Sequence, residues 1–360
     1  LLIIMETIKQ IQQSIITSKE LLRTHFNVKK SFEIAQSNIK NEVDNILEMQ
    51  HKETPVIPEI DYKSIINGEV SFNEIANIKR RGALIIRNVF DDQQASEWND
   101  EVGEYILSND YFTKSVEREG MDQYFSQLKS GAPQIFGIYW SRPQMLARQS
   151  QPMATTKKFL NSLWNVSSPY GDEFDPNNDF IYADRIRRRE PGDETLGLSP
   201  HIDGGSFERW TDPAFQKVYG SVFNGDLKSY DPWNAAYRTQ TKEYKSPAVC
   251  SMFRTFQGWT ALTAQGPSDG TLSLIPIANS MGYLLLRALQ DDIAPDSLCD
   301  ATPGRPLLIS TDYHQDLLDG IVTIQDVNPG DTVWWHPDLT HSVADKHTGK
   351  DFSNVMFIGS

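Results

Sequence analysis

Two segments far apart in the chain carry side chains that could bind one metal ion. The first contains His201 and Asp203, two residues apart and followed by a pair of glycines. On a β-strand, residues two apart project from the same face, so both side chains can reach one ion. The second segment begins with a Pro-Gly turn at 329–330 and ends at His341. Two imidazoles and one carboxylate leave positions open on a metal, which is typical of non-haem Fe(II) oxygen chemistry rather than structural zinc.

His336 is an alternative third ligand, because it directly follows a predicted strand at 331–335. His341 comes after a loop and starts the next predicted strand, so we favour it as the ligand. We interpret His336 as a structural or supporting histidine. An H-x-D pair by itself arises often by chance. Here the downstream histidine supports the interpretation that the pair binds a metal. The remaining histidines have no partner at ligand spacing and are interpreted as surface or core residues: His25, His51, His314 and His347.

The composition narrows the class of protein. The 360 residues carry a formal net charge of −14, which argues against nucleic acid and against an anionic membrane surface as partners. The two cysteines, Cys250 and Cys299, form neither a disulfide framework nor a metal-binding spacing. The apolar run at 1–4 is too short for a secretory signal or a membrane span. We therefore expect a cytoplasmic protein.

The chain divides into two predicted parts. Residues 1–54 form a helical leader, because apolar residues recur at helical spacing between 6 and 49 without proline or glycine. Pro55 and Pro58 then mark a linker. We interpret the leader as a packing collar or as a surface for a partner or for self-association. Residues 55–360 form the second part, a single domain with inserts at about 207–245 and 278–301.

Short strands with regular turns dominate this domain. We predict a strand at 82–90, a helix at 92–108, a loop-rich stretch at 109–180 and a helix at 281–289. The later strands are predicted at 180–187, 195–203, 249–263, 271–277, 306–310, 321–327, 331–335 and 353–358. This pattern predicts a mainly β sandwich or barrel with flanking helices.

The segments around the two histidines, together with 182–189, 230–233 and 253–259, resemble the Fe(II)/2-oxoglutarate-dependent oxygenase superfamily. Within it they are similar to the DUF1479 (YbiU-like) family, a relative of the phytanoyl-CoA dioxygenase-like enzymes. The resemblance covers most of residues 80–358. It implies a double-stranded β-helix (jelly-roll, cupin-like) core with His201, Asp203 and His341 as ligands of Fe(II). It also implies O2-dependent oxidation of a small molecule, coupled to conversion of 2-oxoglutarate to succinate and CO2.

One departure from the superfamily concerns the cation that binds the far carboxylate of 2-oxoglutarate. Many members place it shortly after the distal histidine, but here only Lys346 and Lys350 follow, in a predicted turn. A bidentate arginine fits a carboxylate best. Arg254 is the first candidate, because it lies in an otherwise apolar and aromatic strand. Arg187, from a run of arginines, is the second.

The substrate pocket is less defined by the sequence. Aromatic residues of the first insert and of a neighbouring strand could stack on a ring or a cation, although each could also belong to the core: Trp210, Tyr230, Trp233 and Trp259. Two other functions remain open. The chain could be a non-oxygenase cupin metalloenzyme, or a binding protein that has lost catalysis.

Overall fold

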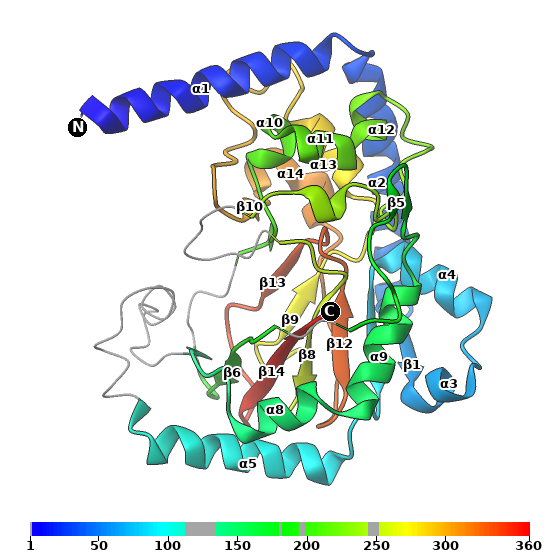
Figure 1. The fold of residues 1–360 in the computed structure, drawn as a ribbon, viewed down its shortest axis with the longest axis vertical. Coiled ribbons are helices and arrows are strands. Elements are labelled where there is room, and N and C mark those ends of the chain that lie inside the picture. The colour runs from blue at the N-terminus through cyan, green and yellow to red at the C-terminus, as the bar shows by residue number, and fades with distance from the viewer. Residues whose placement is uncertain (1, 112–133, 180–181, 194–198, 244–251) are drawn as a thin grey trace.

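Two β-sheets form the centre of the molecule (Figure 1). The computed structural model describes residues 2–111, 134–179, 182–193, 199–243 and 252–360. The larger sheet has seven strands in the order β1 (Glu59–Asp61), β2 (Ala83–Arg87), β12 (Thr332–Trp335), β8 (Gln257–Ala261), β14 (Ser353–Gly359), β6 (Ile186–Arg189) and β3 (Ile135–Phe136). All neighbours in it are antiparallel except β1 and β2.

The smaller sheet has five antiparallel strands in the order β10 (Leu307–Leu308), β7 (His201–Ile202), β13 (His341–Val343), β9 (Leu272–Leu274) and β11 (Val322–Thr323). A separate two-stranded ribbon joins β4 (Ser167–Ser168) to β5 (Gly171–Asp172).

Successive side chains of the seven-stranded sheet project from opposite faces, and each face is buried in a different core cluster. Trp259 and its cross-strand partner Val333 belong to one core cluster, which also contains Leu272 and Leu274 of the smaller sheet. Trp334, one residue further along β12, belongs to a second cluster on the opposite face. The first face therefore looks toward the smaller sheet and the second toward helices.

Helices of the middle of the chain cover this second face: α5 (Asp92–Ser108), α8 (Arg142–Arg148) and α9 (Gln151–Ser162). Asp91 caps α5 by accepting hydrogen bonds from the backbone of Gln93 and Gln94. Two shorter helices, α3 (Tyr62–Asn67) and α4 (Phe72–Arg81), connect β1 to β2. Ser71 and Glu74 form a capping box at the start of α4.

The N-terminal residues form two helices, α1 (Leu2–Arg23) and α2 (Val28–His51), and α1 runs along the end of the molecule opposite α5 (Figure 1). A buried stripe on α2 that includes Ile39, Val43 and Ile46 joins the first core cluster. It packs against α13 (Met281–Arg287) and α14 (Thr311–Leu318).

The remaining helices are α10 (Glu208–Thr211), α11 (Pro213–Val218), α12 (Gly220–Phe223) and the 3-10 turn η1 (Arg238–Gln240). None of the helices among the described residues combines the length and apolar character that crossing a membrane requires.

The structure contains more helix, relative to strand, than the sequence predicts. The helices at 92–108 and in the leader are confirmed, and α13 covers most of the helix predicted at 281–289. The prediction of a mainly β chain is wrong, because more described residues lie in helices than in strands. Helices α8 and α9 occupy part of the stretch predicted as loop. Parts of three predicted strands, at 180–181, 195–198 and 249–251, lie outside the described residues.

Candidate metal centre

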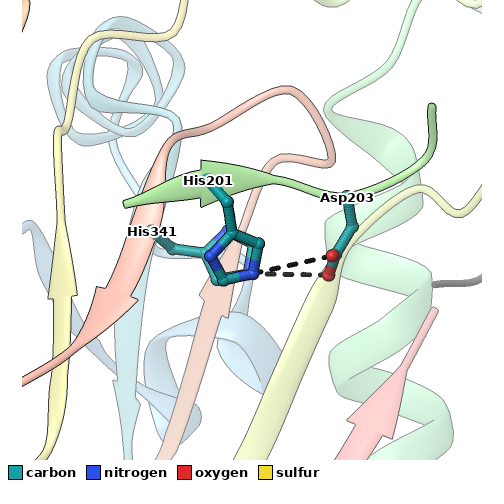
Figure 2. Close-up of side chains that lie close together, drawn as sticks. All are labelled: His201, Asp203 and His341. Atoms are coloured by element: carbon teal, nitrogen blue, oxygen red, sulfur yellow. Dashed lines mark ion pairs between the residues drawn. The ribbon is translucent and has the colours of Figure 1, made fainter. Parts of the chain in front are cut away.

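His201, Asp203 and His341 converge on one point, as Figure 2 shows. His201 begins β7 and His341 begins β13, and the two residues lie directly opposite each other in the antiparallel pair. Their ring centroids are 4.3 Å apart. Asp203 follows β7, and its carboxylate lies 3.6 Å from Nε2 of His201 and 3.5 Å from Nε2 of His341. One ligand atom from each residue lies within 4.8 Å of the others, so one metal ion could contact all three.

Both imidazoles are oriented by the backbone. Nδ1 of His201 lies 2.6 Å from the carbonyl oxygen of Ser199, and Nδ1 of His341 lies 3.1 Å from that of Leu339. Because a carbonyl only accepts, each Nδ1 donates its proton, and each Nε2 keeps a free electron pair facing Asp203. This is the tautomer that a metal-binding histidine needs, and it is set before any ion binds.

The charges of the three side chains also suit a divalent cation. Burial, with the neighbouring His341, lowers the pKa of His201 to about 4, so this imidazole is neutral near pH 7. Burial alone would raise the pKa of Asp203. Contact with the His341 imidazole, and nearby positive charge that includes Arg254, instead hold that pKa well below its usual range. Two imidazole nitrogens and one carboxylate oxygen face one point, a donor set that suits Fe(II).

Gln257 is a part of the site that the sequence prediction missed. Its side chain projects from β8, on the same face as Trp259, and Nε2 donates a 2.6 Å hydrogen bond to Oδ2 of Asp203. The other amide atom, Oε1, is buried without a hydrogen-bond partner among the described residues. Gln257 thus restrains the orientation of the Asp203 carboxylate. The available signal was a polar residue at an inward position of an otherwise apolar strand.

A second buried group, the Asp338 cluster, consists of Asp338, Arg209, Arg238 and Tyr219. Asp338 accepts hydrogen bonds or ion pairs from both arginines and from the tyrosine hydroxyl, each at 2.9 Å. Arg209 reaches further, since its guanidinium also donates to the carbonyl oxygens of Asp203 and Gly205. The cluster therefore ties the insert at 207–245 both to the strand that carries the first ligands and to the loop before His341.

The two arginine candidates lie in different environments. Arg187 projects from β6 and is level across the sheet with Val355. Its guanidinium is almost completely buried and donates to Oε1 of Gln265 and Oγ of Ser353. Arg254 is partly exposed, donates to the Tyr182 hydroxyl at 3.3 Å, and lines a cavity beside Asp203. Lys346 and Lys350 are exposed.

The aromatic candidates occupy packed positions. Trp210 donates to the carbonyl oxygen of Leu285, and Trp233 to that of Lys79. Trp259 is buried within the first core cluster, and Tyr230 is partly buried against it. None of the four is among the described residues that line the cavity beside Asp203.

His336 lies outside the candidate metal centre. It is fully buried, stacks on Trp164 at 4.9 Å, and its ring nitrogens pair with the backbone of Pro232 and Asp338. His314 and His347 are also buried, and His25 and His51 are exposed. Among the described residues, only the three predicted ligands form such a group of potential metal-binding side chains.

The fold and the site together define a two-sheet protein with a candidate metal centre between its sheets. Residues 9–360 match the family described as Gig2-like, and the chain belongs to this family. It is 41% identical over 343 residues to the uncharacterised protein YbiU of Escherichia coli K12, covering 94% of this chain and 81% of YbiU. This confirms the resemblance to the DUF1479 (YbiU-like) family.

Two solved structures extend the comparison. A Salmonella typhimurium LT2 protein provisionally named an oxidoreductase superposes with a TM-score of 0.91 at 40% identity, covering 97% of this chain and 84% of that one. The Candida albicans protein GlcNAc Inducible Gene 2, also described as DUF1479, superposes with a TM-score of 0.79 at 28% identity. That match covers 96% of this chain and 75% of the Candida protein.

Proposed function

We propose that this protein is a non-haem Fe(II)- and 2-oxoglutarate-dependent oxygenase that oxidises a small molecule. The observation that carries the proposal is the convergence of His201, Asp203 and His341 with both Nε2 atoms facing the carboxylate. No fourth His, Cys, Asp or Glu joins this group in the described part of the chain, which favours an open site over a closed structural one. The provisional name of the Salmonella relative agrees with redox chemistry.

The order of the strands supports a double-stranded β-helix around this site. Four strands of the larger sheet, β6, β8, β12 and β14, interleave along the chain with four of the smaller sheet, β7, β9, β11 and β13. A jelly roll has this arrangement, in which eight strands pass back and forth along the chain between two facing sheets. In this reading the candidate metal centre lies inside the roll.

In this proposal each group of residues has a separate role. Bound iron would activate dioxygen with electrons from the decarboxylation of 2-oxoglutarate. His201, Asp203 and His341 would hold the ion and would leave coordination positions open for other ligands. Gln257 keeps the Asp203 carboxylate in one orientation, and the surrounding apolar side chains exclude water from the reacting groups.

Arg187 is the stronger candidate for binding the far carboxylate of 2-oxoglutarate, although the sequence favoured Arg254. Arg187 is level with Ala261, four residues along β8 from Gln257, which is roughly 13 Å along the strand. Its long side chain can extend back over part of that distance. No carboxylate forms an ion pair with it in the described part of the chain. Burial lowers the pKa of Arg187 to about 9, so an anionic ligand would relieve an unfavourable buried charge.

The test incubates metal-free protein with Fe(II), ascorbate and 2-oxoglutarate and follows succinate. We expect slow iron-dependent succinate formation in the wild type and none in His201→Ala. His25→Ala serves as the matched control, because His25 is exposed and remote in sequence from the site. Binding of Fe(II) and of 2-oxoglutarate is measured in the same samples, since turnover without a substrate can be too slow to detect. If neither binds, the proposal fails.

A further inference from the structure

Three residues form a row across the larger sheet at the level of the candidate metal centre. In the register of the strands, Gln257 of β8 lies between Trp335 of β12 and Gly359 of β14. Alternation along each strand places all three on the face of the first core cluster. Gln257 donates to Asp203, and the ring centroid of Trp335 lies 5.3 Å from that of His341. Two members of the row therefore contact candidate metal ligands.

The third member, Gly359, is required for space rather than for backbone conformation. Its φ lies outside the left-handed region, so an alanine could adopt the same extended backbone. A Cβ added to Gly359 would, however, overlap the hydroxyl oxygen and the ring of Tyr182. Glycine inside a strand often marks such a close approach. The hydroxyl of Tyr182 therefore occupies the place that a side chain at position 359 would take.

This position brings the hydroxyl close to the candidate metal centre. Side chains directly opposite each other on neighbouring antiparallel strands have Cβ atoms about 5 Å apart. The Tyr182 hydroxyl, at the place of the missing Cβ of Gly359, therefore lies roughly 5 Å from Cβ of Gln257. The amide of Gln257 in turn lies 2.6 Å from the Asp203 carboxylate. The hydroxyl is thus one side chain away from a candidate ligand and on the same face of the sheet.

Arg254 connects Tyr182 to the same centre. Its Nη1 donates a 3.3 Å hydrogen bond to the hydroxyl oxygen, and its guanidinium carbon lies 6.0 Å from the centroid of the ring. The charge of Arg254 is also among those that lower the pKa of Asp203. A hydroxyl that accepts a hydrogen bond from a cation is polarised, which makes its own O–H a stronger donor.

A 2-oxo acid at the metal would need such a donor. When it binds through its keto oxygen and one carboxylate oxygen, the other carboxylate oxygen is not on the ion. An anionic oxygen in a buried site is costly unless it accepts a hydrogen bond. A tyrosine hydroxyl meets this need as a neutral donor, so it adds no second charge beside Asp203.

We propose that the hydroxyl of Tyr182 donates a hydrogen bond to the 2-oxo acid end of 2-oxoglutarate, and that Gly359 makes room for this hydroxyl. The inference rests on the proposed oxygenase function. It assigns the two ends of the co-substrate to different residues. Tyr182 contacts the end that binds the metal, whereas Arg187 binds the far carboxylate.

The test uses the full chain loaded with Mn(II) in the absence of oxygen, and binding is measured by calorimetry. Two ligands are titrated until the wild type is saturated: 2-oxoglutarate, and pyruvate, a 2-oxo acid without the far carboxylate. Tyr182→Phe removes only the hydroxyl and should weaken both ligands about ten- to a hundredfold, the effect of losing one hydrogen bond to a charged group. Arg187→Met should weaken 2-oxoglutarate and leave pyruvate unchanged.

Gly359→Ala tests the same contact from the other side. Its added methyl group displaces the tyrosine ring, so this variant should also lose affinity for both ligands. The matched controls are Tyr170→Phe, at a residue that is 75% exposed, and Gly220→Ala, where an added Cβ meets no atom of the described residues within 4 Å outside its own helix. Both controls should bind like the wild type. Tyr182→Phe is the decisive variant, and thermal unfolding verifies that it is folded.

The outcomes distinguish failure of the inference from failure of the oxygenase proposal. Equal affinity of 2-oxoglutarate for the wild type and Tyr182→Phe overturns the inference, while the oxygenase proposal stands. Weaker 2-oxoglutarate with unchanged pyruvate also overturns it, because Tyr182 would then contact the far carboxylate. Weaker Mn(II) binding in Tyr182→Phe does the same, because the hydroxyl would then support the metal ligands. If the wild type binds no 2-oxoglutarate, the oxygenase proposal fails and the inference fails with it.

Discussion

Replacing Asp338 by asparagine tests the Asp338 cluster. The carboxylate is 2% exposed and receives two guanidinium groups and one hydroxyl at 2.9 Å each. Asparagine has nearly the same shape, but it is neutral and presents an amide donor to one of the arginines. Arg209 and Arg238 would then stand in the interior as like charges with no counter-charge between them.

The expected loss of stability is large. Removing one partner of a buried ion pair typically costs about 3–5 kcal/mol, because the remaining charge is left without compensation. Asp338 compensates two arginines, whereas the amide oxygen of asparagine can still accept one hydrogen bond. These effects oppose each other, so we expect a decrease of about 3–5 kcal/mol in the free energy of unfolding. That is a substantial part of the total stability of an ordinary domain.

The assay is equilibrium unfolding in urea at pH 7, followed by tryptophan fluorescence. The matched control is Asp292→Asn, which breaks an Asp–Arg pair of similar length with Arg287 at 2.7 Å, but with the carboxylate 65% exposed. An exposed pair contributes at most about 1 kcal/mol, so the control should remain close to the wild type. Equal destabilisation by the two substitutions would refute the reasoning.

A second measurement connects the cluster to the metal centre. Arg209 donates to the carbonyl oxygens of Asp203 and Gly205, so a misplaced Arg209 should disturb the strand that carries the ligands. We therefore expect weaker Mn(II) binding in Asp338→Asn under conditions where the variant is folded. Adding Arg238→Gln removes one of the uncompensated charges and should restore part of the stability, by about 0.5–3 kcal/mol of coupling. No recovery in the double variant would contradict the electrostatic explanation.

Three other substitutions give independent outcomes. Gln257→Leu removes the 2.6 Å hydrogen bond to Asp203 and should weaken Co(II) binding, followed by its visible spectrum, about ten- to a hundredfold; unchanged affinity would exclude a positioning role. Arg187→Met removes a buried charge without an acidic partner among the described residues, so it should raise the free energy of unfolding by about 1–4 kcal/mol while abolishing 2-oxoglutarate binding in calorimetry. A loss of stability with intact binding would contradict this assignment. Burial lowers the pKa of His314 from 6.5 to about 4, so the unfolded chain takes up the proton first, and the stability present above pH 6.5 is lost as the pH falls toward 4. His314→Gln should flatten this part of the urea-unfolding profile, and an unchanged slope would show that His314 does not cause it.

The candidate metal-binding residues could be proposed from the sequence because their geometry is local. His201 and Asp203 project together by the alternation of an extended chain, and His341 follows a turn and a strand that both have clear signals. The arginine proposed to bind 2-oxoglutarate could not be chosen in this way. Whether Arg187 or Arg254 faces the interior depends on which strands become neighbours, and the pairing of β6 with β14 joins residues far apart in the chain.

The helical content was underestimated for a specific physical reason. Pro143 and Pro152 suggested loops between 109 and 180, but each lies in the first turn of a helix, where proline is tolerated because its missing donor would have no partner. The Asp338 cluster could not be predicted from the sequence either. Arg209, Arg238 and Asp338 lie in different segments, and only the folded insert brings their charges together.

The position of β14 has a consequence for the order of events during synthesis. Residues 353–359 fill the place between β8 and β6 in the middle of the larger sheet, so this sheet stays split until the ribosome has released them. At roughly 5–20 residues per second, more than a hundred residues separate the appearance of His201 from that of His341 by several seconds to tens of seconds. A nascent chain therefore holds an open strand edge and an incomplete set of ligands for that interval. An open strand edge is a site for aggregation, and the three candidate ligands can come together only after His341 has been synthesised.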